Sequence, residues 1–174
     1  MDLIPRARNF DLDALEWIYD HHNPGLYRYA YHLLGDENLA EDCVAETFSR
    51  FLKTLQARKG PTGNIQGYLY RSAHNWITDH YRRKNEEYEL DDEMPANDQD
   101  EVETVVEKRI RQQRLRAALT QLPQEQSQVV ALHLIEGWEL EEIAQTMEKS
   151  VGAVKALQHR ALRNLRKYCQ GQIE

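Results

Sequence analysis

The side chains that point to a chemistry in this chain are basic and lie close together near its C-terminal end. Between residues 149 and 167 every charged side chain is a Lys or an Arg, and no Asp or Glu occurs. The basic residues are Lys149, Lys155, Arg160, Arg163, Arg166 and Lys167. Positive charge without nearby acids attracts phosphates, which supply much of the affinity between proteins and nucleic acids. This stretch therefore indicates contact with a nucleic-acid backbone.

Two short amphipathic helices are needed to position these residues. The apolar positions that recur at helical spacing are Ile143, Ala144, Met147, Val154, Leu157, Ala161, Leu162 and Leu165. Ser150 stands between the two patterns, where its hydroxyl can cap the second helix. The segment thus predicts a helix-turn-helix whose second helix reads DNA. Two packed helices with a solvated basic face fit the same pattern, so the rest of the chain must decide.

A second region suited to nucleic acid is a helix predicted at residues 65–84. Aromatic rings alternate there with basic and amide side chains, which suits a strand whose unstacked bases stack on rings while cations hold its phosphates. The residues expected on the outer face are Tyr68, Tyr70, Arg71, His74, Asn75, Trp76, His80, Tyr81, Arg82, Arg83 and Lys84. For each single aromatic residue, burial as a core anchor is the alternative.

The remaining pattern predicts further helices and no sheet. Residues 11–22 and 26–34 form two helical segments separated by Pro24, with Gly35 as a stop signal. A third helix opens at Asn38, and a loop rich in Gly and Pro follows at residues 59–64. Since no run alternates with a period of two, the fold class is all-α.

One acidic segment accounts for the net charge of −7. Of the 29 acids, ten lie in residues 86–103 without a Lys or Arg, so the rest of the chain carries 19 acids against 22 bases. Few large apolar residues occur there to offset the entropy of ordering. We therefore predict two small helical domains, residues 1–85 and 104–174, joined by a flexible acidic linker at residues 86–103.

Several classes of protein are disfavoured by the sequence. No apolar run approaches the roughly 20 residues of a membrane span, and no signal peptide is recognisable, so we expect a cytoplasmic protein without membrane insertion. Cys43 and Cys169 form no CxxC motif and are interpreted as small apolar residues. The histidines match no ligand spacing, and no nucleophile motif occurs. We expect no catalytic residues, metal or cofactor, and hence no enzyme.

Several motifs in order resemble one family. They are residues 38–48 (NLAEDCVAETF), residues 68–75 (YLYRSAHN), the acidic segment, Leu122-Pro123 and the helix-turn-helix. From about Asp11 to Lys167 the chain resembles the extracytoplasmic-function (group IV) sigma factors of bacterial RNA polymerase. The resemblance implies a four-helix promoter-melting domain followed by a helix-turn-helix domain. It also implies a subunit that directs promoter-specific transcription initiation.

The resemblance assigns roles to individual residues. It implies that the third helix docks on the polymerase through Asp42, Glu46 and Phe48. A carboxylate pair four residues apart on one helical face, with an aromatic ring beside it, is a plausible docking patch on physical grounds as well. The implied contacts with the opened minus-ten strand and its phosphates are Asn64, Arg71, Asn75, Arg82, Arg83 and Lys84. The implied readers of the minus-thirty-five duplex are Lys155, Ala156, His159 and Arg160.

The resemblance also implies partners: core RNA polymerase through its β and β′ subunits, promoter DNA, and an anti-sigma factor that clamps the two domains. The acidic linker would thread toward basic channels of the polymerase. Two departures from the family pattern are Gln126-Ser127-Gln128, where many members carry an Arg, and Ala153, where many carry a Thr. The alternative function is a stand-alone helix-turn-helix regulator, which has no use for the motif around Asp42 or for the aromatic helix.

Overall fold

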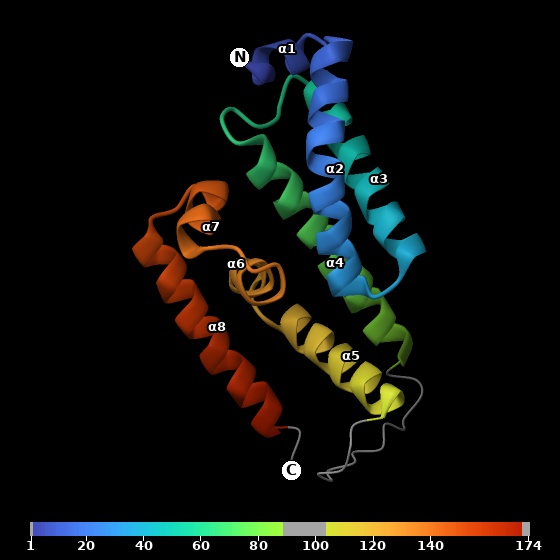
Figure 1. The fold of residues 1–174 in the computed structure, drawn as a ribbon, viewed down its shortest axis with the longest axis vertical. Helices are drawn as coiled ribbons and strands as arrows, with labels where there is room; N and C mark the ends of the chain where they lie inside the picture. Colours follow the sequence, from blue (N-terminus) through green and yellow to red (C-terminus); the bar gives the residue numbers. More distant parts are fainter. Residues whose placement is uncertain (1, 89–103, 172–174) are drawn as a thin grey trace.

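The computed structural model describes residues 2–88 and 104–171, and both ranges are helical (Figure 1). The N-terminal unit consists of α1 (Leu3–Arg8), α2 (Leu12–Leu34), α3 (Glu37–Gln56) and α4 (Ile65–Tyr88). The C-terminal unit consists of α5 (Val105–Gln121), α6 (Gln124–Val130), the π-helical turn η1 (Ala131–Ile135), α7 (Leu140–Met147) and α8 (Val151–Gly171). No strand occurs in either range, which confirms the all-α prediction for the described residues.

The structure describes only the first three residues of the predicted linker at residues 86–103. Glu86 and Glu87 belong to the last turn of α4, so the N-terminal unit extends to Tyr88, three residues past the predicted boundary. Residues 89–103 lie outside the described residues. The side chain of Cys169 also lies outside the described part of the chain.

Helix α2 is continuous, so the predicted break at Pro24 is wrong. Ile18 before the proline and Leu26, Tyr29 and Leu33 after it are buried and recur at helical spacing, so one apolar face runs past Pro24. A proline inside a helix costs about 3 kcal/mol, whereas each fully buried large apolar side chain contributes about 1.5–3 kcal/mol. Burial of the whole face therefore outweighs the local cost. The helix ends at Gly35 (φ 71), as predicted.

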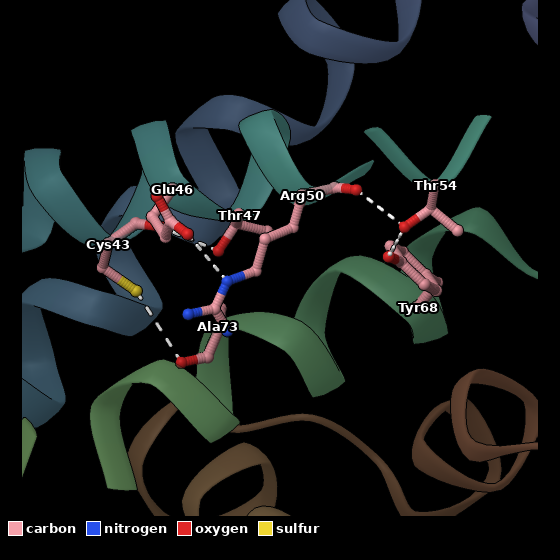
Figure 2. Close-up of polar contacts among 7 residues, drawn as sticks. All are labelled: Cys43, Glu46, Thr47, Arg50, Thr54, Tyr68 and Ala73. Atoms are coloured by element: carbon pink, nitrogen blue, oxygen red, sulfur yellow. Dashed lines mark hydrogen bonds and ion pairs between the residues drawn. The ribbon is translucent and has the colours of Figure 1, made fainter. Parts of the chain in front are cut away.

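Helices α2, α3 and α4 pack against one another, and polar contacts join α3 to α4. Figure 2 shows two of these contacts, from the Cys43 thiol to the carbonyl oxygen of Ala73 (3.7 Å) and between the hydroxyls of Thr54 and Tyr68 (2.9 Å). Burial raises the pKa of Cys43 to about 12, so its thiol stays protonated. Cys43 is thus an unreactive core residue, in agreement with the sequence prediction.

The C-terminal unit packs against one side of α4. Helix α5 begins with a capping box between Thr104 and Glu107. In Figure 1, α5 lies along the lower part of α4, and α6 and α7 follow beside its upper part; α4 makes direct contacts with all three helices. Leu119, Leu122 and Val129 of the C-terminal unit join the same apolar core as the N-terminal helices. The described residues therefore form one body in which α4 is covered from two sides.

Candidate nucleic-acid interface

Helices α7 and α8 form the predicted helix-turn-helix. Helix α7 ends at Glu148, which has a left-handed backbone (φ 54), and the Ser150 hydroxyl accepts a hydrogen bond from the Ala153 amide (3.1 Å). This is the cap that the sequence predicted. Ile143 of α7 and Val154 of α8 are fully buried, which holds the two helices together.

The four predicted duplex readers share one side of α8. Lys155, His159 and Arg160 are exposed, and Ala156 is half-buried. Residues four apart lie above one another on a helix, so these positions form a continuous surface. No acid occurs between Val151 and Gly171. The surface can therefore approach phosphates or the major groove without repulsion from its own helix.

Lys149 does not add to this surface. Its ammonium lies 3.1 Å from the carboxylate of Glu125 on α6, and the lysine side chain is 29% exposed. The pair ties the turn between α7 and α8 to α6. A second tie joins the Asn164 amide to the side-chain oxygen of Gln126 (3.0 Å), so one of the residues that depart from the family pattern holds α6 on α8.

The second candidate surface lies on α4. Arg71, Asn75 and Arg82 recur at intervals of four and seven residues, so they occupy one stripe of the helix. Arg71 and Arg82 are exposed and Asn75 is half-buried. The Arg82 guanidinium lies 3.9 Å from Asp79, a weak surface pair. Arg83 and Lys84 are exposed on other sides of the same turn, so the end of α4 is basic on several faces.

Two residues expected on the outer face of α4 are instead buried. Tyr70 is 4% exposed and His74 is 2% exposed. His74 accepts or donates a hydrogen bond at Nδ1 with the hydroxyl of buried Tyr29 (2.7 Å). Tyr68 is half-buried and anchored to Thr54 (Figure 2). These rings therefore anchor the core and do not form an outer surface for nucleic acid.

Asn64 is already bound within the chain. Its side-chain oxygen accepts a hydrogen bond from the Gly67 amide (2.8 Å), which caps the start of α4. Its amide nitrogen donates to the carbonyl oxygens of Gln145 (2.8 Å) and Thr146 (2.9 Å) at the end of α7. Sequence reasoning identified the residue but not this partner, because nothing local in either segment signals a contact across 81 residues.

The three candidates for polymerase docking occupy two sides of α3: Asp42 and Glu46 share one side, and Phe48 faces the core. Asp42 is exposed, and the Glu46 carboxylate is half-buried and bonded to Arg50 (2.8 Å; Figure 2). Phe48 is only 8% exposed and packs on Tyr19 of α2, with 4.8 Å between ring centroids. Six residues along a helix place Phe48 about 120° around the axis from Asp42, so the aromatic ring does not lie beside the carboxylates. The exposed apolar residues near Phe48 are Tyr19 and Leu52, which the sequence did not single out.

No group of three His, Cys, Asp or Glu side chains in residues 2–88 and 104–171 is placed to hold a metal ion. None of the helices in these ranges has the length and apolar character to cross a bilayer.

Two family models match the chain, in an order that follows its two units. Residues 18–87 match the model described as Sigma-70 region 2, and residues 112–165 match Sigma-70, region 4. The first match covers most of α2 to α4. The second covers α5 from its middle, the helix-turn-helix and most of α8.

Individual relatives agree with these matches. ECF RNA polymerase sigma factor BldN of Streptomyces coelicolor is 32% identical over 171 residues, which are 95% of this chain and 64% of BldN. The chain therefore spans less than two thirds of that relative. ECF RNA polymerase sigma factor SigL of Mycobacterium tuberculosis is 30% identical over 86% of this chain and 85% of SigL. The solved structure of CnrH, with the cytosolic domain of CnrY, shares the fold over 97% of this chain and 96% of CnrH (TM-score 0.58, 21% identity).

Proposed function

The chain belongs to the extracytoplasmic-function sigma factors, and on that premise we propose that it binds core RNA polymerase and directs promoter-specific transcription initiation. The observation that carries the proposal is the pair of matches in family order, each on its own helical unit with a basic surface. In this role the protein acts in the cytoplasm and is not itself an enzyme. The proposed domains are residues 1–85 and 104–174 with a linker at residues 86–103, and helix α4 continues from the first domain to Tyr88.

The two basic surfaces have separate tasks in this proposal. The exposed side of α8 reads the minus-thirty-five duplex through Lys155, His159 and Arg160, while Ala156 lets the helix come close to the groove. The stripe on α4 captures the opened minus-ten strand. Asn75 and Asn64 offer amides that both donate to and accept from base edges. Each unstacked base that stacks on an aromatic ring contributes about 1–3 kcal/mol to binding of the opened strand. Opening of the promoter duplex therefore needs no nucleotide hydrolysis.

The exposed outer side of α3 is the proposed docking site for the polymerase. Asp42 offers an exposed carboxylate, and Glu46 lies one turn further along with its charge shared with Arg50. Phe48 supports this helix from inside by packing on Tyr19. The partners are the β′ subunit at α3, the β subunit, promoter DNA, and an anti-sigma factor that clamps the two units; the family resemblance is the support for each.

The test is binding of the purified chain to bacterial core RNA polymerase, followed by run-off transcription from fragments of the genome that encodes it. Asp42→Arg should weaken binding by about tenfold or more, because the substitution reverses a charge at the docking surface. Asp20→Arg makes the same charge change at an exposed position of α2 and should bind like the unmodified chain.

New promoter-specific transcripts that depend on the chain would support the proposal. The opposite result is absence of binding to core polymerase together with specific binding of duplex DNA by the chain alone. That result would overturn the sigma-factor proposal and leave a stand-alone helix-turn-helix regulator.

A further inference from the structure

We propose that the free chain inhibits itself: the C-terminal unit closes over Asn64, one of the residues proposed to capture the opened strand. This inference rests on the proposed function for the role of Asn64, but the closed arrangement itself follows from contacts in the structure. The contacts form a seam between α4 with its preceding loop and the segment from α6 to α7.

The centre of the seam is the double hydrogen bond from Asn64. The last carbonyl groups of a helix lack partners within the helix, and the end of α7 obtains them from the amide of Asn64 in the other unit. The same side chain caps α4 through the Gly67 amide. All of its hydrogen-bonding groups are thus engaged within the chain. Asn64 therefore cannot contact a base until α7 leaves.

Gly67 permits the close approach of the two units. A Cβ atom at this position would overlap the carbonyl oxygen of Thr146, far inside any contact distance found for real side chains. Because this is a backbone atom at the end of α7, it cannot move without moving the helix. Glycine is less favourable than alanine inside a helix, so its presence in α4 is explained by the seam rather than by the helix.

Further contacts extend the seam away from Asn64. The rings of Tyr70 on α4 and Trp138 before α7 meet edge to face at 5.0 Å. On α2, the His32 ring nitrogen lies 2.6 Å from the carboxylate of Glu136, which is only 8% exposed. The guanidinium of Arg116 on α5 donates to the His32 carbonyl oxygen (3.1 Å). Contacts this far apart hold the C-terminal unit in one orientation.

At the Asn64 end, the closed seam leaves little room for nucleic acid. A cavity of about 140 Å³ remains between Asn64, Tyr68 and Arg71 on one side and Gln128, Thr146 and Met147 on the other. Pockets that hold small organic ligands usually measure about 300–1,000 Å³. A base therefore cannot enter the space between Asn64 and Thr146 unless the units separate. Only the fraction of molecules that is open can bind a strand, and the apparent affinity falls by that fraction.

The test compares the full chain with Gly67→Ala and Asn64→Asp. The added methyl group of Gly67→Ala collides with α7 only in the closed state. Asn64→Asp keeps the oxygen that caps α4 but sets a carboxylate against two carbonyl oxygens. Both variants should open the seam, so failure of either one to fold does not remove the test. Gly152→Ala on α8, where the nearest atom to an added Cβ is 4.0 Å away, is the matched control.

The conformational measurement is small-angle scattering of the free chain together with hydrogen exchange of residues 64–71 and 140–148. In the opened variants we expect a larger radius of gyration and about tenfold or faster exchange on both sides of the seam. Gly152→Ala should match the unmodified chain. An extended unmodified chain, or variants that fold and stay as compact as it, would overturn the closed state.

The functional measurement is binding to a forked promoter fragment in the presence of core polymerase. Gly67→Ala should bind at least about threefold more tightly than the unmodified chain if closure hides Asn64, because the open fraction rises. Equal affinities with a proven conformational change would overturn the inhibitory role. If no form of the chain binds core polymerase, the proposed function fails while the scattering result still decides whether the closed state exists.

Discussion

His74 and Tyr29 show how a residue of α4 can be polar and yet belong to the core. Both side chains are buried and bonded to each other. Burial lowers the pKa of His74 to about 4 and raises the pKa of Tyr29, so both groups are neutral near pH 7. Among the described residues nothing is bonded to Nε2 of His74. Protonation would therefore place a charge in the core with no acid beside it.

The stability of the protein should fall in mild acid because of His74. Its pKa is about 4 in the folded chain and about 6.5 in the unfolded one, so the full stability is present above pH 6.5 and is lost as the pH falls toward 4. The loss amounts to about 3 kcal/mol. His74→Asn keeps a partner for Tyr29 but cannot titrate. Urea unfolding at steps of pH should show a shallower decline for the variant.

Other groups also titrate in this range, since burial and the charge of His21 lower the pKa of His22 to about 4. The comparison between the two chains removes their contribution. Parallel declines of the unmodified chain and His74→Asn would contradict the prediction.

At single residues, sequence reasoning succeeded where the cause is local and was limited where the partner is distant. The cap at Ser150 and the shared side of Lys155, His159 and Arg160 follow from spacing within a few residues. The burial of His74 does not, because α4 is covered by two units and so lacks the single polar side that periodicity assumes.

At the scale of elements, three helices within residues 2–88 and 104–171 end with a left-handed residue that is not glycine. These residues are Phe10 (φ 55), Arg58 (φ 55) and Glu148 (φ 54). After each one the next amide bonds a carbonyl five residues back, from Asp11 to Arg6, from Lys59 to Thr54 and from Lys149 to Ala144. This is the pattern of a Schellman motif, in which glycine is usual. A side chain in this conformation costs roughly 1–2 kcal/mol.

Arg58→Gly should therefore stabilise the protein. The residue is exposed, and the gain should be about 0.5–1 kcal/mol, because the greater freedom of glycine in the unfolded chain offsets part of the relief. The change is measured as the free energy of unfolding in urea. Gly35→Ala makes the reverse exchange at φ 71 and should destabilise. An unchanged or lower stability of Arg58→Gly would show that the end of α3 is not strained.

Helices and loops were predicted correctly where the sequence carries a local signal such as a capping residue or a helix breaker. The helix-turn-helix and the loop at residues 59–64 carry caps and breakers, and they were placed correctly. The break at Pro24 was wrong because burial of a continuous apolar face decided the outcome. The π-helical turn Ala131–Ile135 has the same apolar spacing as an ordinary helix, so the sequence gives no signal for it.

At the scale of the molecule, the two units share a core although their family matches are separate. Leu119 and Leu122 of the C-terminal unit belong to the same buried cluster as Leu69 and Ile77 of α4. Sequence patterns predicted the two units but not their contact, because each unit has a complete helical pattern of its own. The contact depends on a few specific features, chiefly Gly67 and Asn64, that have meaning only when both units are in place.

A shared core should make the free chain unfold as one cooperative body. We expect a single transition in scanning calorimetry for the unmodified chain, because separation of the units exposes apolar surface of both. Gly67→Ala should divide it into two transitions, since units without a seam melt at their own temperatures. Gly152→Ala gains the same helix propensity without touching the seam and should keep one transition. If the unmodified chain already shows two resolved transitions, the seam contributes too little free energy to couple the units. The seam would then also be too weak to keep the open state at a minor population, which self-inhibition requires.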